Sequence, residues 1–176
     1  YLLCYISFPA DWLELFPSQP QFYYYSGLGY NQLSEFKKAK DVLESGLDYL
    51  VDDKALEINL SNLNYSSTAM TQNGLAELYL LTNRPDKGKN YALDAFQNAK
   101  IFNAQNEIAN SYNLISRVYA AHNNMDSAYH YLHLANALKD SLQNIEKENI
   151  RKFNTTLLNE NLRNKDQMAE RDALQS

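Results

Sequence analysis

The fold of this chain is decided by the stretch Tyr112–Ala135, YNLISRVYAAHNNMDSAYHYLHLA. Its apolar residues recur at spacings of three and four positions, which is the pattern of amphipathic α-helices. The polar run His122–Asn124 interrupts this pattern, and Asn124 or Asp126 can cap the helix that follows. The stretch therefore predicts two antiparallel helices joined by a short turn.

A pattern of small and aromatic residues within this stretch recurs twice upstream. Ser116 is followed three positions later by Tyr119, and 12 and 19 positions later by Ala128 and Ala135. Small residues let two crossing helices approach closely, and a large ring from the facing helix fills the remaining space. The upstream copies, which have the same spacing, consist of Gly27, Tyr30, Ala39 and Gly46, and of Ala76, Tyr79, Gly88 and Ala95.

The helix boundaries follow from turn residues and from the distribution of glycine and proline. Pro85 pre-sets φ for the first turn of a helix. After Gly88 the chain contains neither glycine nor proline, so a helix beginning near Met125 should continue through most of the remaining sequence. We therefore expect an all-α fold, an α-α superhelix of antiparallel helix pairs with a long C-terminal helix. The expected pairs lie at residues 22–50, at residues 69–102 and from residue 106 onward, with turns at Ser34–Glu35, Asn83–Pro85 and His122–Asn124.

The chain should divide into three parts. Residues 1–19 are interpreted as the remnant of a preceding helical repeat, and residues 139–176 as a long C-terminal helix or connector. Residues 20–138 hold the repeats, at about 20–53, 69–102 and 109–138, with an irregular helical segment at 54–68. Either the helix from Phe36 continues past Asp53, or a piece of chain is missing between Asn59 and Ser66 relative to a regular array; we favour the second interpretation.

Composition sets limits on the function. The 176 residues are 45% hydrophobic, which is enough to bury the core of one domain. The net charge of -5 argues against direct nucleic-acid binding, which depends on clustered Lys and Arg. No apolar run approaches the roughly 18 residues of a membrane span. Cys4 cannot form an internal disulfide, and because the chain begins with Tyr1 and not Met, we treat it as a piece of a longer protein.

The repeat resembles the tetratricopeptide repeat, a family in which a small residue, a tyrosine and two alanines fall at these spacings. The resemblance covers roughly residues 11–138, and the third copy matches best. The second copy departs from the family pattern at Gly88, where alanine is expected, and glycine should weaken that helix by about 1 kcal/mol. The resemblance implies a superhelix in which stacked helix pairs share one core.

The resemblance also implies a function. In this family, ligands usually lie along the concave surface made by the first helix of each repeat. The chain would then be a scaffold that binds a protein or peptide segment, with its polar groove residues bonding to the backbone or to one charged group of that segment. The groove residues carried over from the family are Tyr24, Leu28, Asn31, Asn73, Glu77, Asn113, Arg117 and Ala121.

No sequence motif indicates a catalytic or metal site. Nucleophile-elbow, zinc-protease and phosphate-loop motifs are absent from the sequence, so we expect no catalytic residues and no cofactor. His130 and His133 are three positions apart, but no third ligand stands at a suitable spacing, so we interpret them as surface histidines.

A second hypothesis concerns signal transmission through the C-terminal helix. The segment Leu138–Leu142 resembles the ends of repeat arrays in bacterial two-component sensor kinases, so the chain could be an extracytoplasmic sensor domain. The apolar stripe of residues 139–176 changes frame near Ile150 and Leu158, which favours a short homodimer contact or a connector over a long zipper. Both hypotheses assume a bacterial protein. The compartment stays open, with a periplasmic or envelope location favoured over the cytoplasm.

Overall fold

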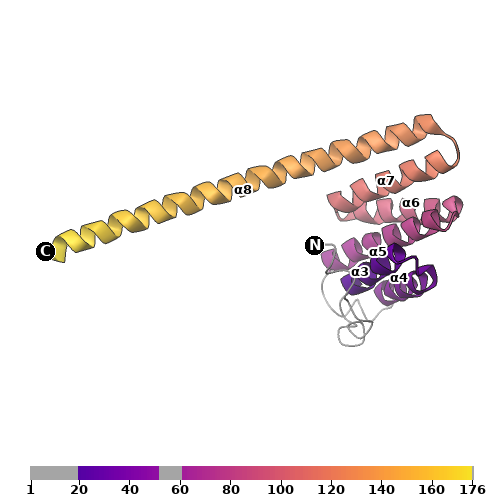
Figure 1. The fold of residues 1–176 in the computed structure, drawn as a ribbon, viewed down its shortest axis with the longest axis horizontal. Coiled ribbons are helices and arrows are strands. Elements are labelled where there is room, and N and C mark those ends of the chain that lie inside the picture. The colour runs from indigo at the N-terminus through magenta and orange to yellow at the C-terminus, as the bar shows by residue number, and fades with distance from the viewer. Residues whose placement is uncertain (1–19, 52–60, 176) are drawn as a thin grey trace. The chain divides into compact units, whose positions relative to one another are not determined.

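The computed structural model describes residues 20–51 and 61–175. These residues form six α-helices and no strand, so the predicted all-α fold with a long C-terminal helix is confirmed (Figure 1). Residues 54–60 of the irregular segment and the whole N-terminal remnant with Cys4 lie outside the described residues. The helices are α3 (Pro20–Gln32), α4 (Phe36–Val51), α5 (Ser61–Leu81), α6 (Pro85–Ile101), α7 (Gln105–Ala121) and α8 (Met125–Gln175).

The predicted helix boundaries hold within a few residues, with one exception. We expected the first helix of the second pair to begin near Ala69, but α5 begins at Ser61. Residues 61–68 were predicted to belong to a separate, irregular helical segment, and the structure instead joins them to the second pair as the first turns of α5. Ser67 in this extension is buried.

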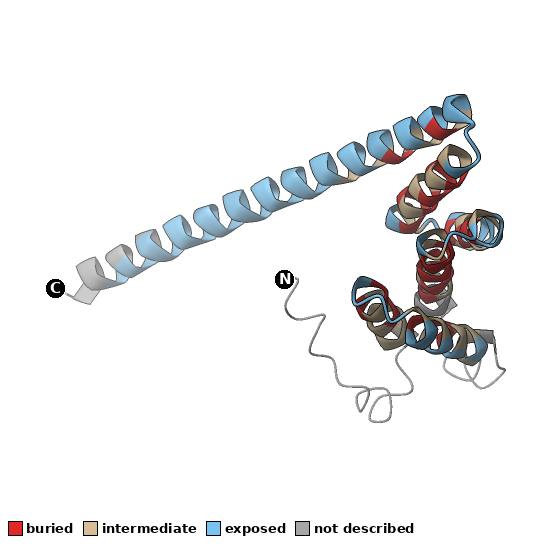
Figure 2. Cartoon of the chain, turned by 45° about the vertical axis from the view of Figure 1, so that its right-hand side comes forward, coloured by how far each residue is buried: buried red, intermediate tan, exposed pale blue. Residues whose placement is uncertain are grey.

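The chain consists of two compact units, residues 1–138 and residues 139–176. In the first unit, α3 packs against α4, α4 against α5, α5 against α6, and α6 against α7. The first helices of successive pairs also touch, α3 with α5 and α5 with α7. Figure 2 shows the buried residues gathered on the faces that these helices turn toward one another. This arrangement is a helical-repeat stack.

The small positions of the repeat are the places where the helices of a pair approach most closely. The hydroxyl group of Ser116 on α7 donates a hydrogen bond of 2.7 Å to the backbone carbonyl of Ala128 on α8. At the same register in the second pair, a Cβ added to Gly88 would lie 3.0 Å from the backbone carbonyl of Ala76. The glycine that departs from the family pattern therefore fits a tighter crossing. All nine small positions are buried: Gly27, Ala39, Gly46, Ala76, Gly88, Ala95, Ser116, Ala128 and Ala135.

The tyrosine of each repeat packs between its helices. The ring of Tyr79 stacks on that of Tyr91 with centroids 5.5 Å apart, and the ring of Tyr119 stacks on that of Tyr131 at the same distance. In both repeats the first tyrosine lies in the first helix, and its stacking partner lies in the second helix, 12 positions later in the sequence. Stacked aromatic pairs of this kind contribute about 0.5–1.5 kcal/mol beyond their buried area.

One turn geometry closes all three pairs. Ser34, Asn83 and Asn123 hold positive φ angles of 59°, 57° and 58°. After each turn, a backbone N–H donates back to the carbonyl of the repeat tyrosine; the Asn124 N–H, for example, lies 2.9 Å from the carbonyl oxygen of Tyr119. A left-handed residue followed by this bond satisfies carbonyl groups that the end of a helix would otherwise leave open.

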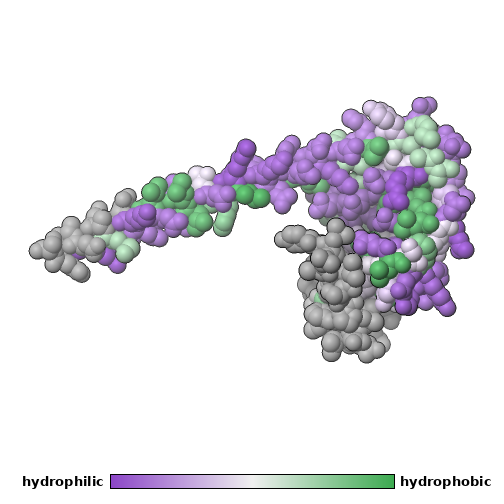
Figure 3. All heavy atoms as spheres, in the orientation of Figure 1, coloured by the Kyte–Doolittle hydropathy of each residue, from purple (hydrophilic) through white to green (hydrophobic). Residues whose placement is uncertain are grey.

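The second unit is the continuation of α8. Between Lys139 and Arg171, each residue whose burial is described is exposed, except half-buried Leu142. Figure 3 shows apolar side chains gathered on this part of the helix. Within the described residues, no helix is long and apolar enough to span a membrane.

Candidate ligand-binding cavity

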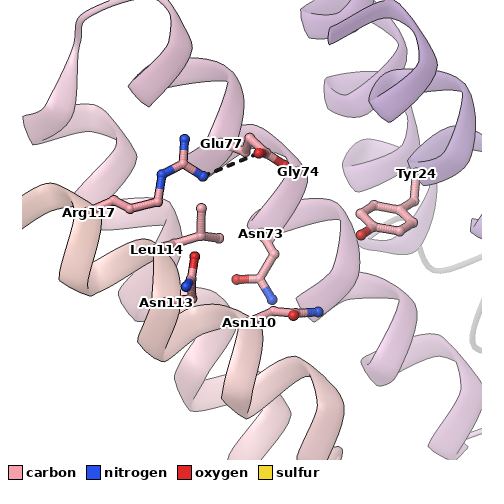
Figure 4. A pocket seen from close by; sticks show the side chains of 8 residues that line it. All are labelled: Tyr24, Asn73, Gly74, Glu77, Asn110, Asn113, Leu114 and Arg117. Atoms are coloured by element: carbon pink, nitrogen blue, oxygen red, sulfur yellow. Dashed lines mark hydrogen bonds and ion pairs between the residues drawn. The ribbon is translucent and has the colours of Figure 1, made fainter. Parts of the chain in front are cut away.

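A cavity of about 130 Å³ lies among the first helices of the three repeats. Tyr24 lines it from α3, Asn73 and Glu77 from α5, and Asn113 and Arg117 from α7. These are five of the eight groove residues predicted from the sequence, and the fold brings them together. Figure 4 shows the Tyr24 ring extending from α3 toward the residues of α5 and α7.

Comparisons with protein-family models, curated proteins and solved structures found no match.

The register explains why these side chains meet. Tyr24, Asn73 and Asn113 each stand three positions before the small residue of their repeat, and Glu77 and Arg117 each stand one position after it. Positions four apart lie on one face of a helix, so stacking the repeats aligns these faces. The cavity is therefore a consequence of the repeat, with lining residues that differ from copy to copy.

Asn73 acts as a structural bridge between α5 and α7. Its amide nitrogen lies 3.1 Å from a carboxylate oxygen of Glu107, and its amide oxygen accepts a bond of 2.9 Å from the hydroxyl of Ser111. Its side chain is only 4% exposed. Because both ends of the amide have protein partners, Asn73 orients the cavity wall and is not a free ligand-binding group.

Glu107 lies behind this wall with 8% of its surface exposed. Burial raises the pKa of its carboxyl group, and hydrogen bonds from Asn73 and Asn110 oppose that rise. The net direction is upward because desolvation disfavours the charged form. A carboxyl group whose charge is costly thus lies behind Asn73, where it lines a second cavity and not this one.

Glu77 and Arg117 form an ion pair at the rim of the cavity. The guanidinium nitrogen of Arg117 lies 3.3 Å from a carboxylate oxygen of Glu77, and both side chains are about two-fifths exposed (Figure 4). Partly exposed pairs of this kind contribute little to stability, so a charged ligand group can replace either partner at small cost. Asn113, on the same face of α7, has no hydrogen-bond partner among the described residues.

The other three predicted groove residues lie elsewhere. Leu28 lines a second cavity of about 340 Å³, together with Tyr24, Gln32 and Met70 among others. Ala121 is exposed at the last residue of α7 and lines neither of these cavities. Asn31 requires a separate explanation.

Asn31 is buried, with neither amide atom in a hydrogen bond. It stands four positions after the small residue of its repeat, where the second copy has Leu80 and the third has Ala120. An amide that replaces an apolar residue at a packing position loses its water without gaining a partner. Asn31 therefore packs in the interior of the stack and lines neither of the two cavities.

Sequence reasoning missed several cavity residues that the structure reveals. Asn110, Gly74 and Leu114 line the first cavity, and Glu107 and Met70 line the second. Asn110 was detectable in principle, because it stands three and seven positions before two predicted groove residues of α7 and so shares their face. Glu107 carried no such signal, because its role depends on a contact with α5.

The histidines lie outside both cavities. His122 ends α7, and its ring nitrogens lie 2.9 Å from the carbonyl oxygen of Val118 and 3.0 Å from a carboxylate oxygen of Asp86. These two partners raise the pKa of His122. His130 and His133 are exposed on α8, and within the described residues no cluster of three or more metal-ligand side chains occurs.

Proposed function

We propose that this chain is a non-catalytic interaction module, similar to tetratricopeptide-repeat proteins, that binds a protein or peptide segment in the cavity between α3, α5 and α7. The observation that carries the proposal is the set of polar groups left available at this cavity. Asn113 has an unengaged amide, and the Glu77–Arg117 pair is partly exposed and exchangeable. An amide can donate to and accept from a peptide backbone, and an ion pair can exchange for a charged ligand side chain.

The size of the cavity favours a segment over a folded surface. Its volume of about 130 Å³ is close to the roughly 150 Å³ that holds a benzene-sized group in an engineered protein cavity. One side chain of an extended segment fills such a space while its backbone follows the helices. Tyr24 then supplies an aromatic wall on the α3 side, where it can pack against that side chain.

A selection from a displayed library of random peptides tests this proposal. We expect the natural chain to enrich a family of related sequences, and the double variant Asn113→Ala with Arg117→Glu to lose binding to them. The matched control is Asn90→Ala with Arg84→Glu, which makes the same two changes at exposed positions outside the cavity. Equal binding by both double variants would move the binding site away from the cavity.

The sensor hypothesis is retained as a second candidate because α8 runs without a break from the last repeat into the second unit. A continuous helix is a suitable mechanical link between a sensing repeat stack and an output domain. Under this hypothesis the native protein continues past residue 176 into an apolar span or a catalytic domain. Sequencing the gene downstream distinguishes the two candidates, because a stop codon soon after residue 176 leaves a free-standing adaptor.

A further inference from the structure

The second cavity, of about 340 Å³, is lined by a buried carboxyl group that has no cation beside it. Glu107 lines this cavity and is 8% exposed. Its hydrogen-bond partners are the neutral amides of Asn73 and Asn110. Within residues 20–51 and 61–175, no lysine, arginine or histidine forms an ion pair with it. A buried carboxylate without a counter-charge is costly, so this cavity favours a ligand that brings one positive charge.

Two aromatic rings line the same cavity. The ring centroids of Tyr24 and Tyr25 lie 5.2 Å apart, and the ring planes are inclined to each other by 58°. The face of a tyrosine ring attracts a cation that lies within about 6 Å of its centroid. Two inclined rings and a carboxyl group in one cavity are the groups that recognise an organic ammonium ion.

The rest of the lining favours a cation on a hydrocarbon stem over a bare metal ion. Leu28 from α3 and Met70 from α5 contribute apolar side chains to the cavity. The part of the chain that the structure describes contains no cluster of three or more metal-ligand side chains. The cavity also exceeds the roughly 150 Å³ that holds a benzene-sized group in an engineered protein cavity, so a long side chain fits.

The partners of Glu107 favour an ammonium group over a guanidinium group. Arginine binds a carboxylate best with two parallel hydrogen bonds, which require both carboxylate oxygens to be open to it. The amides of Asn73 and Asn110 already donate to this carboxylate. Since a carboxylate has about four acceptor positions, room remains for the single N–H contacts of an ammonium group. The amide of Gln32, which also lines the cavity, offers a further acceptor.

We propose that the second cavity binds a lysine side chain, with its ammonium group at Glu107 and its hydrocarbon stem along Leu28 and Met70. The lysine belongs to the segment that occupies the first cavity, so this inference rests on the proposed function. Tyr24 lines both cavities, and one extended segment can therefore reach both. The other lining residues of the two cavities differ, so variants can separate the two sites.

An NMR titration of the full chain tests the lysine site directly. The probes are N-acetyl-lysine N-methylamide and its norleucine counterpart, which has the same stem without the ammonium group. Gly29 lines the second cavity and Gly74 the first, so their amide signals report the two sites separately. The lysine probe should shift the Gly29 signal and bind at least about tenfold more tightly than the norleucine probe, because only lysine supplies the missing counter-charge.

Three variants assign this preference to the cavity. Glu107→Gln removes the charge but keeps an oxygen that can accept from Asn73, and it should abolish the preference for lysine over norleucine. Asp94→Asn is the matched control, because it removes a carboxylate at an exposed position of α6 outside both cavities, and it should keep the preference. Leu28→Trp fills the space of the stem without changing a charged group, and it should prevent binding of both probes.

Four results of the titration would overturn the lysine site. They are equal affinity for the two probes, including no binding of either, a preference that survives Glu107→Gln, an equal loss in Asp94→Asn, and undiminished binding by Leu28→Trp.

The peptides selected on the natural chain separate this inference from the proposed function. They should share a lysine at one position. Selected peptides without lysine that still depend on Asn113 and Arg117 would overturn the lysine site and leave the first cavity its role. Lysine-containing peptides that bind the Asn113→Ala, Arg117→Glu variant normally but fail with Glu107→Gln would overturn the proposed function of the first cavity instead.

Discussion

Ala128 shows at the scale of a single residue why the repeat requires small side chains. It is buried at the crossing of α7 and α8, and its carbonyl accepts the hydroxyl of Ser116. Ala128→Phe should lower the free energy of unfolding by about 1–3 kcal/mol, because the crossing cannot widen without breaking this bond. Urea unfolding measures the change. Ala137→Phe on the exposed side of α8 should cost less than about 1 kcal/mol, and equal losses at the two positions would contradict the assigned register.

Glu107 determines a pH dependence at the same scale. Burial raises the pKa of its carboxyl group above the ordinary value of 4.5. A group with a raised folded pKa contributes stability that is fully present below its unfolded pKa and is lost as the pH rises through the folded pKa. Glu107→Gln removes that loss, so it should raise the unfolding free energy at neutral pH and give no gain below about pH 4.5. Thermal unfolding across this range measures the difference, and a pH-independent difference would contradict the assignment.

At the scale of elements, the turns account for the regular shape of the stack. The three turns within pairs and the turn between α6 and α7 all use one residue with positive φ, which is asparagine in three cases and Ser34 in the first. Asparagine tolerates this conformation better than serine, and glycine adopts it without penalty.

Ser34→Gly should therefore stabilise the chain by about 1 kcal/mol, since the left-handed conformation costs a residue with a Cβ roughly 1–2 kcal/mol. The melting temperature measures this gain. Ser26→Gly, within α3, is the matched control and should destabilise by roughly 0.5–1 kcal/mol, because glycine is a poor helix former. A loss of stability at Ser34 would mean that the turn does not hold the described conformation.

At the scale of the whole molecule, the melting temperature tests whether the second unit self-associates. If residues 139–176 make the short homodimer contact considered for them, association stabilises the folded state by mass action, and the melting temperature of the full chain rises with concentration. A chain shortened to residues 1–138 lacks the second unit and should melt at a temperature that does not depend on concentration. Differential scanning calorimetry over a wide concentration range measures both. A concentration dependence that survives the truncation would place self-association in the repeats.

The helix pairs, their turns and the nine buried small positions were predictable from the order of the residues. These features depend on residues within one or two turns of each other, or on a spacing that repeats, so the periodicity of the chain is sufficient to predict them. The long C-terminal helix followed in the same way from the absence of glycine and proline after Gly88.

Which groove residues are available to a ligand depends on contacts across the stack, and these contacts could not be predicted from the sequence. Asn73 and Glu107 are 34 positions apart, and their hydrogen bond forms only because α5 and α7 stack side by side. That contact makes Asn73 a structural bridge, whereas Asn113, at the same register one repeat later, stays unengaged. Asn31 is buried for the same reason, since its neighbours come from the stack. Residues at the same position of successive repeats acquire different roles because each repeat has different neighbours. A sequence pattern specifies the spacing of residues along a helix, but it does not specify the groups that face them across the stack.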